Sequence, residues 1–380
     1  MPEHRWAKRM LQICPHDAAP FAGLCERYVQ AGAQIGVVVT TVYLAAPSAA
    51  ALPSVHYLSC RNLADTKSVR AALAAFASES WDVVLCHRYR SYWSAIHSPL
   101  AKNMCVVVAH EFGLMSRWQR RLGRRLYASK AIFAGVSAEV AEELRPNTIT
   151  PAVVLPNVVD VPQARVALVS REEALHTLGL SAGLVNIGVV GRLHYKKRPE
   201  VALATFLKLA QLHADIRLVF LGDGEPEAVL AKLSKSESAV ARELIEQKRI
   251  CFAGPVVDAA RFFRAFDVLL HPTQIEAFGM VVLEAMIAGV PVVTLPKGGP
   301  RFVLGDLGVY AKEDSIEGFV AAIETVLHGG YLRTLGPEPG RLVDIESYQD
   351  SAWQRIEQRF SISALAQSLS ELLAQDNMAR

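Results

Sequence analysis

The stretch Asp267–Leu295, DVLLHPTQIEAFGMVVLEAMIAGVPVVTL, decides how the rest of the chain is interpreted. It begins with a short apolar run over 268–270, which indicates a buried strand. Apolar residues at helical spacing over 278–288 predict a helix, and the Gly and Pro that follow are typical of a helix end. The apolar run 290–295 predicts a second strand. A strand, loop, helix and strand in this order are typical of a parallel sheet.

Two carboxylates, Glu276 and Glu284, frame the junction between the loop and the predicted helix. Between them, the amides over 278–280 are expected to point out of the helix N-terminus, where backbone N–H groups and the helix dipole attract anions. A polyphosphate could bind to these amides, while Glu284 accepts hydrogen bonds from sugar hydroxyls.

The two glutamates enclose seven residues, AFGMVVL, and a G-x-P-V exit follows at 289–292. This pattern resembles the E-x7-E signature of retaining nucleotide-sugar glycosyltransferases of family 4. The resemblance implies an α/β fold of the GT-B class, with two Rossmann-like doubly wound domains facing a central cleft. The alternative is an ordinary buried βαβ unit with two solvated glutamates. The flanking strand, the Phe-Gly dipeptide and the exit favour the signature.

The length of 380 residues also predicts two domains, because single hydrophobic cores rarely exceed about 250–300 residues. The segment VVLPNVVDV over 153–161 resembles the family's interdomain segment. We predict an N-terminal acceptor domain over 1–158, a C-terminal nucleotide-sugar donor domain over 159–345, and terminal helices over 346–380 that return to the first domain.

Composition narrows the class of protein. Hydrophobic residues make up 51% of the chain and charged residues 20%, which is typical of globular proteins. No apolar run reaches the roughly 18–20 residues that a membrane-spanning helix needs, and the first residues lack the apolar segment of a signal peptide. The six cysteines show no CxxC pair or metal-ligand spacing, so we expect no metal site and a cytoplasmic location.

A second motif lies at the start of the predicted donor domain. Arg192 follows an apolar strand, and Lys197 comes five residues later. The pair resembles the family's GRL-x4-K motif. Such cations stabilise the charge that grows on a nucleoside diphosphate as it leaves. Lys196 and Arg198 are interpreted as residues of a basic surface turn.

The resemblance implies roles for individual residues. Arg192, Lys197 and the helix N-terminus would hold the diphosphate, Val256 lies near where the family stacks its base, and Glu284 would contact the ribose. The predicted catalytic residues are His110, near the reacting centre, and Glu276, at the donor sugar. The predicted donor-binding residues are Arg192, Lys197, Val256, Phe278, Gly279, Met280, Val281 and Glu284.

In the first half, His110 follows the apolar strand 104–109, and ligands of doubly wound sheets bind at the carboxyl ends of strands. A histidine in such a place can also be a structural hydrogen-bonding group. The predicted acceptor-side residues follow other strands: His16, Gly23, His87 and Arg88.

Positive charge is concentrated in the first half of the chain. Residues 1–160 hold 17 Lys and Arg against 11 Asp and Glu, and the remainder holds 23 against 26. The stretch 115–130 is rich in arginine and is called the basic stretch. One face of a helix formed by it would carry Trp118, Leu122 and Leu126. This combination is typical of a helix that binds an anionic membrane surface. A solvated helix or a site for a phosphorylated acceptor would also fit. The predicted membrane-surface residues are Arg117, Trp118, Arg120, Arg121, Arg124 and Arg125.

These observations predict a retaining hexosyltransferase that uses a nucleotide sugar, with UDP-hexose favoured, and no cofactor or metal. The basic helix, and the resemblance of HPTQIEAFGMVVLEA to core hexosyltransferases, favour a lipopolysaccharide-core or other envelope acceptor on the inner face of the cytoplasmic membrane. No nucleic-acid partner is expected. A nucleotide-sugar-binding protein without transfer activity is the alternative, because the first loop lacks the Gly-Gly pair common in the family.

A glycosidase that uses the two glutamates as its catalytic pair is excluded on spacing. Glycosidase carboxyls lie about 5–9.5 Å apart, whereas eight helical residues rise about 12 Å.

Overall fold

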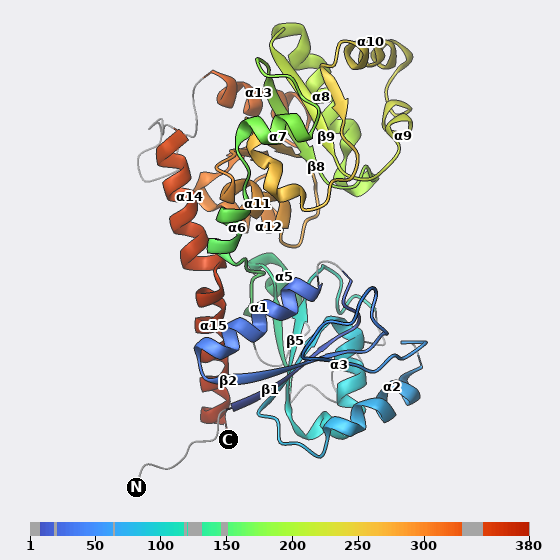
Figure 1. Cartoon of the computed structure of the whole chain (residues 1–380), viewed down its shortest axis with the longest axis vertical. Helices are drawn as coiled ribbons and strands as arrows, with labels where there is room; N and C mark the ends of the chain where they lie inside the picture. Colours follow the sequence, from blue (N-terminus) through green and yellow to red (C-terminus); the bar gives the residue numbers. More distant parts are fainter. Residues whose placement is uncertain are drawn as a thin grey trace. The chain divides into compact units, whose positions relative to one another are not determined.

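The computed structural model describes residues 8–18, 21–63, 65–117, 120, 131–145, 151–328 and 345–379. The chain forms two compact units (Figure 1). Unit 1 comprises Met1–Asp160 and Glu357–Arg380, and unit 2 comprises Val161–Ile356. The division between the units lies two residues beyond the predicted boundary. Residues 346–356, which we expected to join the first domain, belong to unit 2.

Unit 1 contains a parallel sheet of seven strands in the order β3-β2-β1-β4-β5-β6-β7. The strands are β1 Lys8–Cys14, β2 Val37–Tyr43, β3 Val55–Tyr57, β4 Val83–His87, β5 Met104–Ala109, β6 Ala131–Gly135 and β7 Val153–Val154. The helices include α1 Phe21–Gln34, α2 Thr66–Leu73, α3 Arg88–Ile96, α5 Ala138–Leu144 and α15 Ile362–Ala379. Helix α15 packs beside α1, so the end of the chain completes the first unit (Figure 1).

Unit 2 repeats this arrangement with six parallel strands in the order β10-β9-β8-β11-β12-β13. They are β8 Val185–Val190, β9 Ile216–Leu221, β10 Ile250–Phe252, β11 Val268–His271, β12 Val292–Thr294 and β13 Val309–Tyr310. The helices include α6 Val161–Ala167, α7 Arg171–Thr177, α8 Pro199–Leu212, α9 Pro226–Leu230, α10 Lys235–Glu246, α11 Met280–Ile287, α12 Gly298–Leu304 and α13 Ile316–Leu327. Helix α14, Ile345–Phe360, belongs to unit 2 as far as Ile356, and its last residues belong to unit 1.

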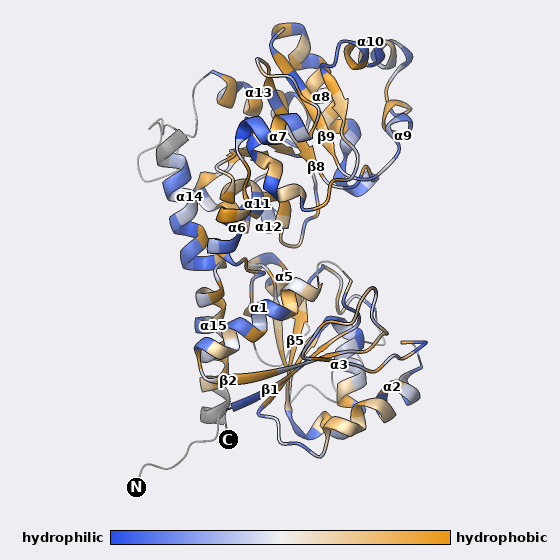
Figure 2. Ribbon diagram, viewed as in Figure 1, coloured by the Kyte–Doolittle hydropathy of each residue, from blue (hydrophilic) through white to orange (hydrophobic). Residues whose placement is uncertain are grey.

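The strands are apolar because helices cover both faces of a parallel sheet. Strand β4 is buried along its whole length, and so is β9. Figure 2 shows apolar residues concentrated in the strands, whereas α14 carries many polar ones. No helix in the described part of the chain is long and apolar enough to cross a membrane.

The central stretch forms the predicted strand, helix and strand: β11, α11 and β12. The helix begins at Met280, two residues later than predicted, because Gly279 has the left-handed φ of +91° and serves as the N-cap. Glycine adopts this conformation without the steric penalty that a side chain would bring. Glu276 therefore lies in the loop before the helix, and Glu284 lies in its second turn.

Both sheets change direction at equivalent places. In unit 1 the order turns between β1 and β4, and in unit 2 between β8 and β11. In doubly wound folds, ligands bind beyond the carboxyl ends of the strands at such a switch point. The predicted site residues of each unit can therefore be located against these two strand pairs.

Candidate functional site

The switch point of unit 2 brings Lys197 and Glu276 together from segments 79 residues apart. Lys197 ends a short 3-10 turn after β8, and Glu276 lies in the loop after β11. Their Nζ and Oε2 atoms are 2.5 Å apart, and the side chains are 33% and 20% exposed. The two groups were predicted to contact different parts of a donor. In the structure they form an ion pair with each other.

His271, the last residue of β11, lies next to Glu276. Its ring is buried, and Nε2 is 3.6 Å from Oε2 of Glu276. Burial lowers the pKa of His271 and the charge of Lys197 adds to this effect, although contact with Glu276 opposes it. His271 is therefore a neutral ring beside the ion pair at neutral pH. His271 directly follows the predicted strand 268–270, as His110 follows its predicted strand, but it was not among the predicted site residues.

Glu276 is held in its ionised form. Burial by itself would raise the pKa of this carboxyl, but the contact with His271 and the charge of Lys197 outweigh it and lower the pKa to about 2. A carboxylate of this kind accepts hydrogen bonds at neutral pH and cannot donate a proton. Because Glu276 precedes α11, the helical rise used to exclude a glycosidase does not measure its distance from Glu284. The low pKa excludes Glu276 as a glycosidase's general acid instead.

The loop containing Glu276 is fixed by a second loop. The amide of Gly299 donates to the carbonyl oxygen of Glu276 at 2.8 Å. A Cβ at Gly299 would lie 2.3 Å from Cα of Phe278, so a larger residue would force the two backbones apart. The Gly298-Gly299 pair thus supports the backbone just before α11.

Arg198 is a correction to the sequence analysis, which placed it on the surface. Its side chain is only 17% exposed, and its Nη1 lies 2.6 Å from Oδ1 of Asp314. The same Nη1 donates to the carbonyl oxygen of Pro272 at 3.0 Å, and Gln274 Nε2 donates to Asp314 at 2.7 Å. Arg198 and Asp314 therefore join the turn of Lys197 to the loop of Glu276.

The other predicted donor residues lie around this cluster. Arg192 is exposed directly after Gly191, and Val256 is half-buried after β10. Met280 and Val281 are half-buried in the first turn of α11, where helix geometry supplies no intrahelical acceptor for the amides. Glu284 is half-buried one turn further along.

In unit 1, the switch point joins three side chains in a buried hydrogen-bonded chain. Gln12 Nε2 donates to the carbonyl oxygen of Cys25 and to Thr41, so Gln12 Oε1 is the acceptor for His87 Nε2 at 3.0 Å. His87 then carries its proton on Nε2, and its Nδ1 accepts from His110 Nε2 at 3.0 Å. These hydrogen bonds determine which ring nitrogen carries the proton in neutral His87 and in neutral His110.

His110 is neutral at neutral pH. Burial, together with the nearby His87 and Arg88, lowers its pKa well below the usual 6.5, and a hydrogen bond with Asn157 only partly opposes this. His87 and His110 were predicted as separate site residues, and in the structure they are in direct contact.

Phe21 connects His110 to the other predicted acceptor-side residues. Its ring makes edge contacts with His16 and His110, and the Arg88 guanidinium lies 4.9 Å from its centroid. Gly23 lies in the first turn of α1, where a Cβ would meet only the side chain of Arg27 at ordinary contact distance. Nothing around Gly23 requires glycine.

The predicted membrane-surface set is only partly described. Trp118, Arg121, Arg124 and Arg125 lie outside the described residues. Arg117 is exposed, whereas Arg120 is half-buried, 4.4 Å from the centroid of the Tyr89 ring, and donates to Leu114 O. Within the described residues, no group of three or more His, Cys, Asp or Glu side chains could hold a metal ion.

Comparisons with known proteins agree with this architecture. A family described as "Glycosyltransferase Family 4" matches residues 21–163, and one described as "Glycosyl transferases group 1" matches residues 185–329. The first match lies in unit 1 and extends over the first three residues of unit 2, and the second match lies within unit 2. Together they cover most of the chain.

Curated relatives match over shorter stretches. A D-inositol 3-phosphate glycosyltransferase of Mycobacterium marinum is 29% identical over 161 residues, which cover 41% of this chain and 33% of the relative. The lipopolysaccharide core biosynthesis glycosyltransferase LpsE of Rhizobium meliloti is 35% identical over 127 residues, covering 33% of this chain and 35% of LpsE. These alignments span about a third of each relative's length.

The whole fold matches solved structures. HepE of Anabaena, solved in complex with UDP and glucose, has a TM-score of 0.71 at 18% identity, covering 97% of this chain and all of that one. The two doubly wound parallel-sheet units are those of the GT-B fold. The chain belongs to the glycosyltransferases of family 4.

Proposed function

We propose that this protein is a retaining glycosyltransferase that moves a hexose from a UDP-hexose donor to a glycan or lipid-linked acceptor in envelope glycan synthesis. The observation that carries the proposal is the Lys197–Glu276 ion pair at the switch point of unit 2, beside the N-terminus of α11. It offers a cation for a diphosphate and an ionised carboxylate for sugar hydroxyls at one place.

The donor would bind by exchanging partners with this pair. Lys197 is now held by Glu276, and a diphosphate would take part of its charge while Glu276 accepts hydrogen bonds from the sugar. Arg192 and the first amides of α11 would share the phosphate charge, and Glu284 would contact the ribose. His110 is neutral and so would act near the reacting centre as a hydrogen-bonding group, without a charge of its own.

The names of similar proteins support the choice of donor and acceptor. HepE was solved with UDP and glucose, and LpsE is named for lipopolysaccharide core biosynthesis. We extend these properties to the present chain as the most economical hypothesis. A panel of nucleotide sugars, with product detected by mass spectrometry, tests it. UDP-hexose should give transfer to a core-type acceptor with the anomeric configuration retained.

Two other results of the panel would change the assignment. Tight UDP-hexose binding with neither transfer nor donor hydrolysis would mean a binding protein. Product with inverted anomeric configuration would contradict a front-face mechanism, in which a donor phosphate oxygen helps to deprotonate the acceptor hydroxyl.

We also propose that transfer needs no divalent metal, because Arg192, the α11 amides and Lys197, once the donor replaces Glu276 as its partner, would neutralise the diphosphate. Turnover should be unchanged in excess EDTA and with added Mg²⁺ or Mn²⁺. Loss of turnover in EDTA that either ion restores would contradict this part of the proposal.

We further propose that the basic stretch docks the protein on an anionic membrane. Each cation near such a surface contributes about 1 kcal/mol, and the attraction weakens within a Debye length of about 10 Å at 0.1 M salt. Replacing Arg121, Arg124 and Arg125 with Gln should abolish co-sedimentation with anionic liposomes at low salt. Arg120 is left in place because it lies in a pocket wall. Undiminished sedimentation of the variant would refute the docking role.

A further inference from the structure

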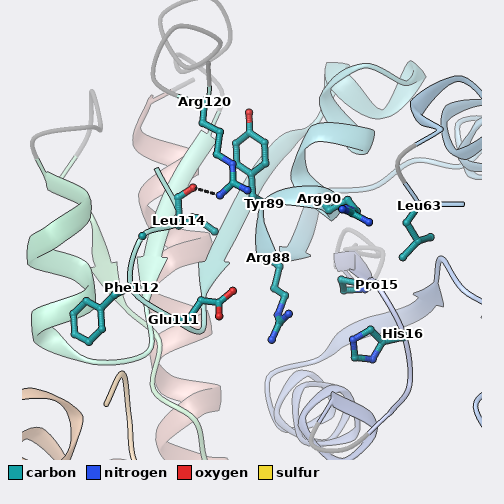
Figure 3. A pocket seen from close by; sticks show the side chains of 11 residues that line it. Pro15, His16, Leu63, Arg88, Tyr89, Arg90, Glu111, Phe112, Leu114 and Arg120 are labelled. Atoms are coloured by element: carbon teal, nitrogen blue, oxygen red, sulfur yellow. Dashed lines mark hydrogen bonds between the residues drawn. The ribbon is translucent and has the colours of Figure 1, made fainter. Parts of the chain in front are cut away.

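Unit 1 contains a pocket of about 360 Å³ at its own switch point (Figure 3). The loops that follow β1 and β5, and the first turn of α3, which follows β4, form most of its wall. The residues that line it are Pro15, His16, Leu63, Arg88, Tyr89, Arg90, Glu111, Phe112, Gly113, Leu114 and Arg120. This volume is near the lower end of the range for small-molecule sites, about 300–1,000 Å³. It suits a ligand about as large as one sugar unit.

The charge of the pocket wall is positive. Three arginines, at 88, 90 and 120, face one carboxylate, Glu111. Arg120 is held by the ring of Tyr89 and the carbonyl oxygen of Leu114, and interacts with the charge of Glu111. Arg88 and Arg90 are then left as the cations that a ligand could neutralise.

The side chain of Arg88 points into this pocket (Figure 3). It is the first residue of α3 and has the left-handed φ of +70°, which side-chain-bearing residues rarely adopt. Its guanidinium lies over the Phe21 ring and projects between Glu111 and the loop of Pro15 and His16 (Figure 3). Positive φ at a non-glycine residue persists where the surrounding structure enforces it, often at functional sites.

Two buried nitrogen atoms on the pocket wall have no hydrogen-bond partner among the described residues. They are Nε of Arg88 and Nδ1 of His16. Buried polar atoms are nearly always paired in native proteins, with protein groups, ordered water, an ion or a ligand. Two such atoms on one pocket wall are positions where a ligand could replace water. The nine-residue helix α3 begins directly after β4, so its first amides lie at the same end of the sheet, and its N-cap, His87, makes no side-chain capping bond to them.

We propose that this pocket binds a phosphomonoester carried by a sugar-sized unit of the acceptor. A phosphomonoester has a charge of about −1.5 to −2 at pH 7, which matches the net charge of the wall. The planar guanidinium of arginine recognises such a group through two parallel hydrogen bonds. Glu111 would then accept a hydrogen bond from a hydroxyl group of the sugar ring. The inference rests on the proposed function, since it assigns the phosphate to the acceptor and leaves the donor diphosphate to unit 2.

The test measures binding to the full chain by calorimetry, without donor, so that it does not depend on turnover. The probes are hexose and inositol monophosphates, their unphosphorylated forms, and inorganic phosphate. The sugar phosphates should bind at least tenfold more tightly than the unphosphorylated sugars, and more tightly than inorganic phosphate. The affinity should fall as salt rises, because the interaction is ionic.

The variant Arg88→Gln with Arg90→Gln should lose at least tenfold in sugar-phosphate affinity, and Arg88→Lys should fall between it and the wild type, because lysine keeps the charge without the fork. Lys67→Gln removes an exposed cation of α2 that does not line the pocket, and it should bind as the wild type does. Equal affinity in the double variant and the wild type would overturn the proposal. Circular dichroism establishes that each variant is folded.

A lipid headgroup could supply the same chemistry. Vesicles that carry phosphatidic acid are therefore compared with soluble sugar phosphates. Arginine-dependent binding to these vesicles alone would overturn the acceptor assignment, as would inorganic phosphate binding as tightly as the sugar phosphates. If the wild type binds UDP and transfers hexose but binds no sugar phosphate, this inference fails while the proposed function stands. If it binds sugar phosphate but shows no transfer, the proposed function fails.

Discussion

The two switch points share a strand order and differ in how their charges are paired. In unit 2 the principal cation, Lys197, is neutralised by Glu276 at 2.5 Å, with His271 as a neutral neighbour. In unit 1 the two histidines pair with each other, and the Arg88 Nε has no partner among the described residues. The topology determines where a ligand can bind, and the pairing of the side chains there determines which charged or hydrogen-bonding groups the ligand needs.

The difference predicts different responses to mutation. A paired cation is released only when a ligand replaces its partner, so unit 2 should respond mainly in turnover. The cations of the unit 1 pocket, Arg88 and Arg90, have no carboxylate to release first in the part of the chain that the structure describes, so their variants should respond mainly in the affinity for an acceptor.

The largest effect is expected from Lys197→Ala. It removes the cation that would stabilise the leaving diphosphate, and losing such a group typically raises the barrier by about 2.7–4 kcal/mol. Turnover should fall on the order of a hundredfold or more. Lys208→Ala is the matched control, because Lys208 forms an exposed ion pair with Glu317 on the same unit. Similar turnover in the two variants would exclude Lys197 from the chemistry.

Glu276→Gln should have the next largest effect. It keeps the shape of the side chain and removes the charge that accepts hydrogen bonds from the donor sugar. Hydrogen bonds to charged groups contribute about 1.5–3 kcal/mol, so turnover should fall about ten- to a hundredfold. UDP affinity should not fall, because Lys197 loses its competing partner.

The control is Glu317→Gln, the partner of Lys208. Steady-state kinetics and UDP titration separate the two quantities. A parallel loss of UDP affinity and turnover would show that Glu276 positions Lys197 and does not act on the sugar.

Gln12→Met is expected to reduce turnover about tenfold, since a lost buried hydrogen bond is equivalent to about 1–3 kcal/mol. Gln12 is a positioning residue: it fixes the proton of His87, which in turn fixes that of His110. Gln12→Asn keeps both an oxygen acceptor and an amide donor on a shorter side chain and should restore part of the turnover. Because Gln12 acts through the protons of the two histidines, Gln12→Met should also change the pH profile of turnover. An unchanged pH profile and no rescue by the second variant would show that Gln12 has only a structural role.

Much of the fold follows from the sequence alone. The apolar runs of β4, β5, β8 and β11 are continuous because both faces of a parallel sheet are buried, and this placed the strands nearly correctly. The helix start was wrong by two residues because Gly279 takes a left-handed conformation that spacing does not reveal. Strand ends also identified which residues could line a site.

The contacts between those residues could not be predicted. Spacing shows that Lys197 and Glu276 follow different strands, but only the register of β8 against β11 shows that they meet. Arg198 was taken for a surface residue because its partner, Asp314, is 116 residues away. His271 was overlooked although it follows a strand, which is the signal that selected His110.

The smallest expected effect is on the pH dependence of the free energy of unfolding, and it tests one buried histidine in each unit. Burial lowers the pKa of both His110 and His271 below 6.5. The unfolded chain then binds more protons than the folded one between the lowered pKa and 6.5, so the free energy of unfolding should decrease as pH falls below 6.5. Glu276 adds a second loss between pH 4.5 and about 2, where its carboxylate becomes protonated in the unfolded chain first. Replacing either histidine with Asn should reduce the total loss of unfolding free energy below pH 6.5 by about 1.4 kcal/mol for each unit of pKa shift removed. Denaturant unfolding at pH 5, 6 and 7 measures it, with His176→Asn on the exposed face of α7 as control. If both variants keep the wild-type slope, neither ring is held neutral, and the two switch points differ only in their carboxylate and arginine.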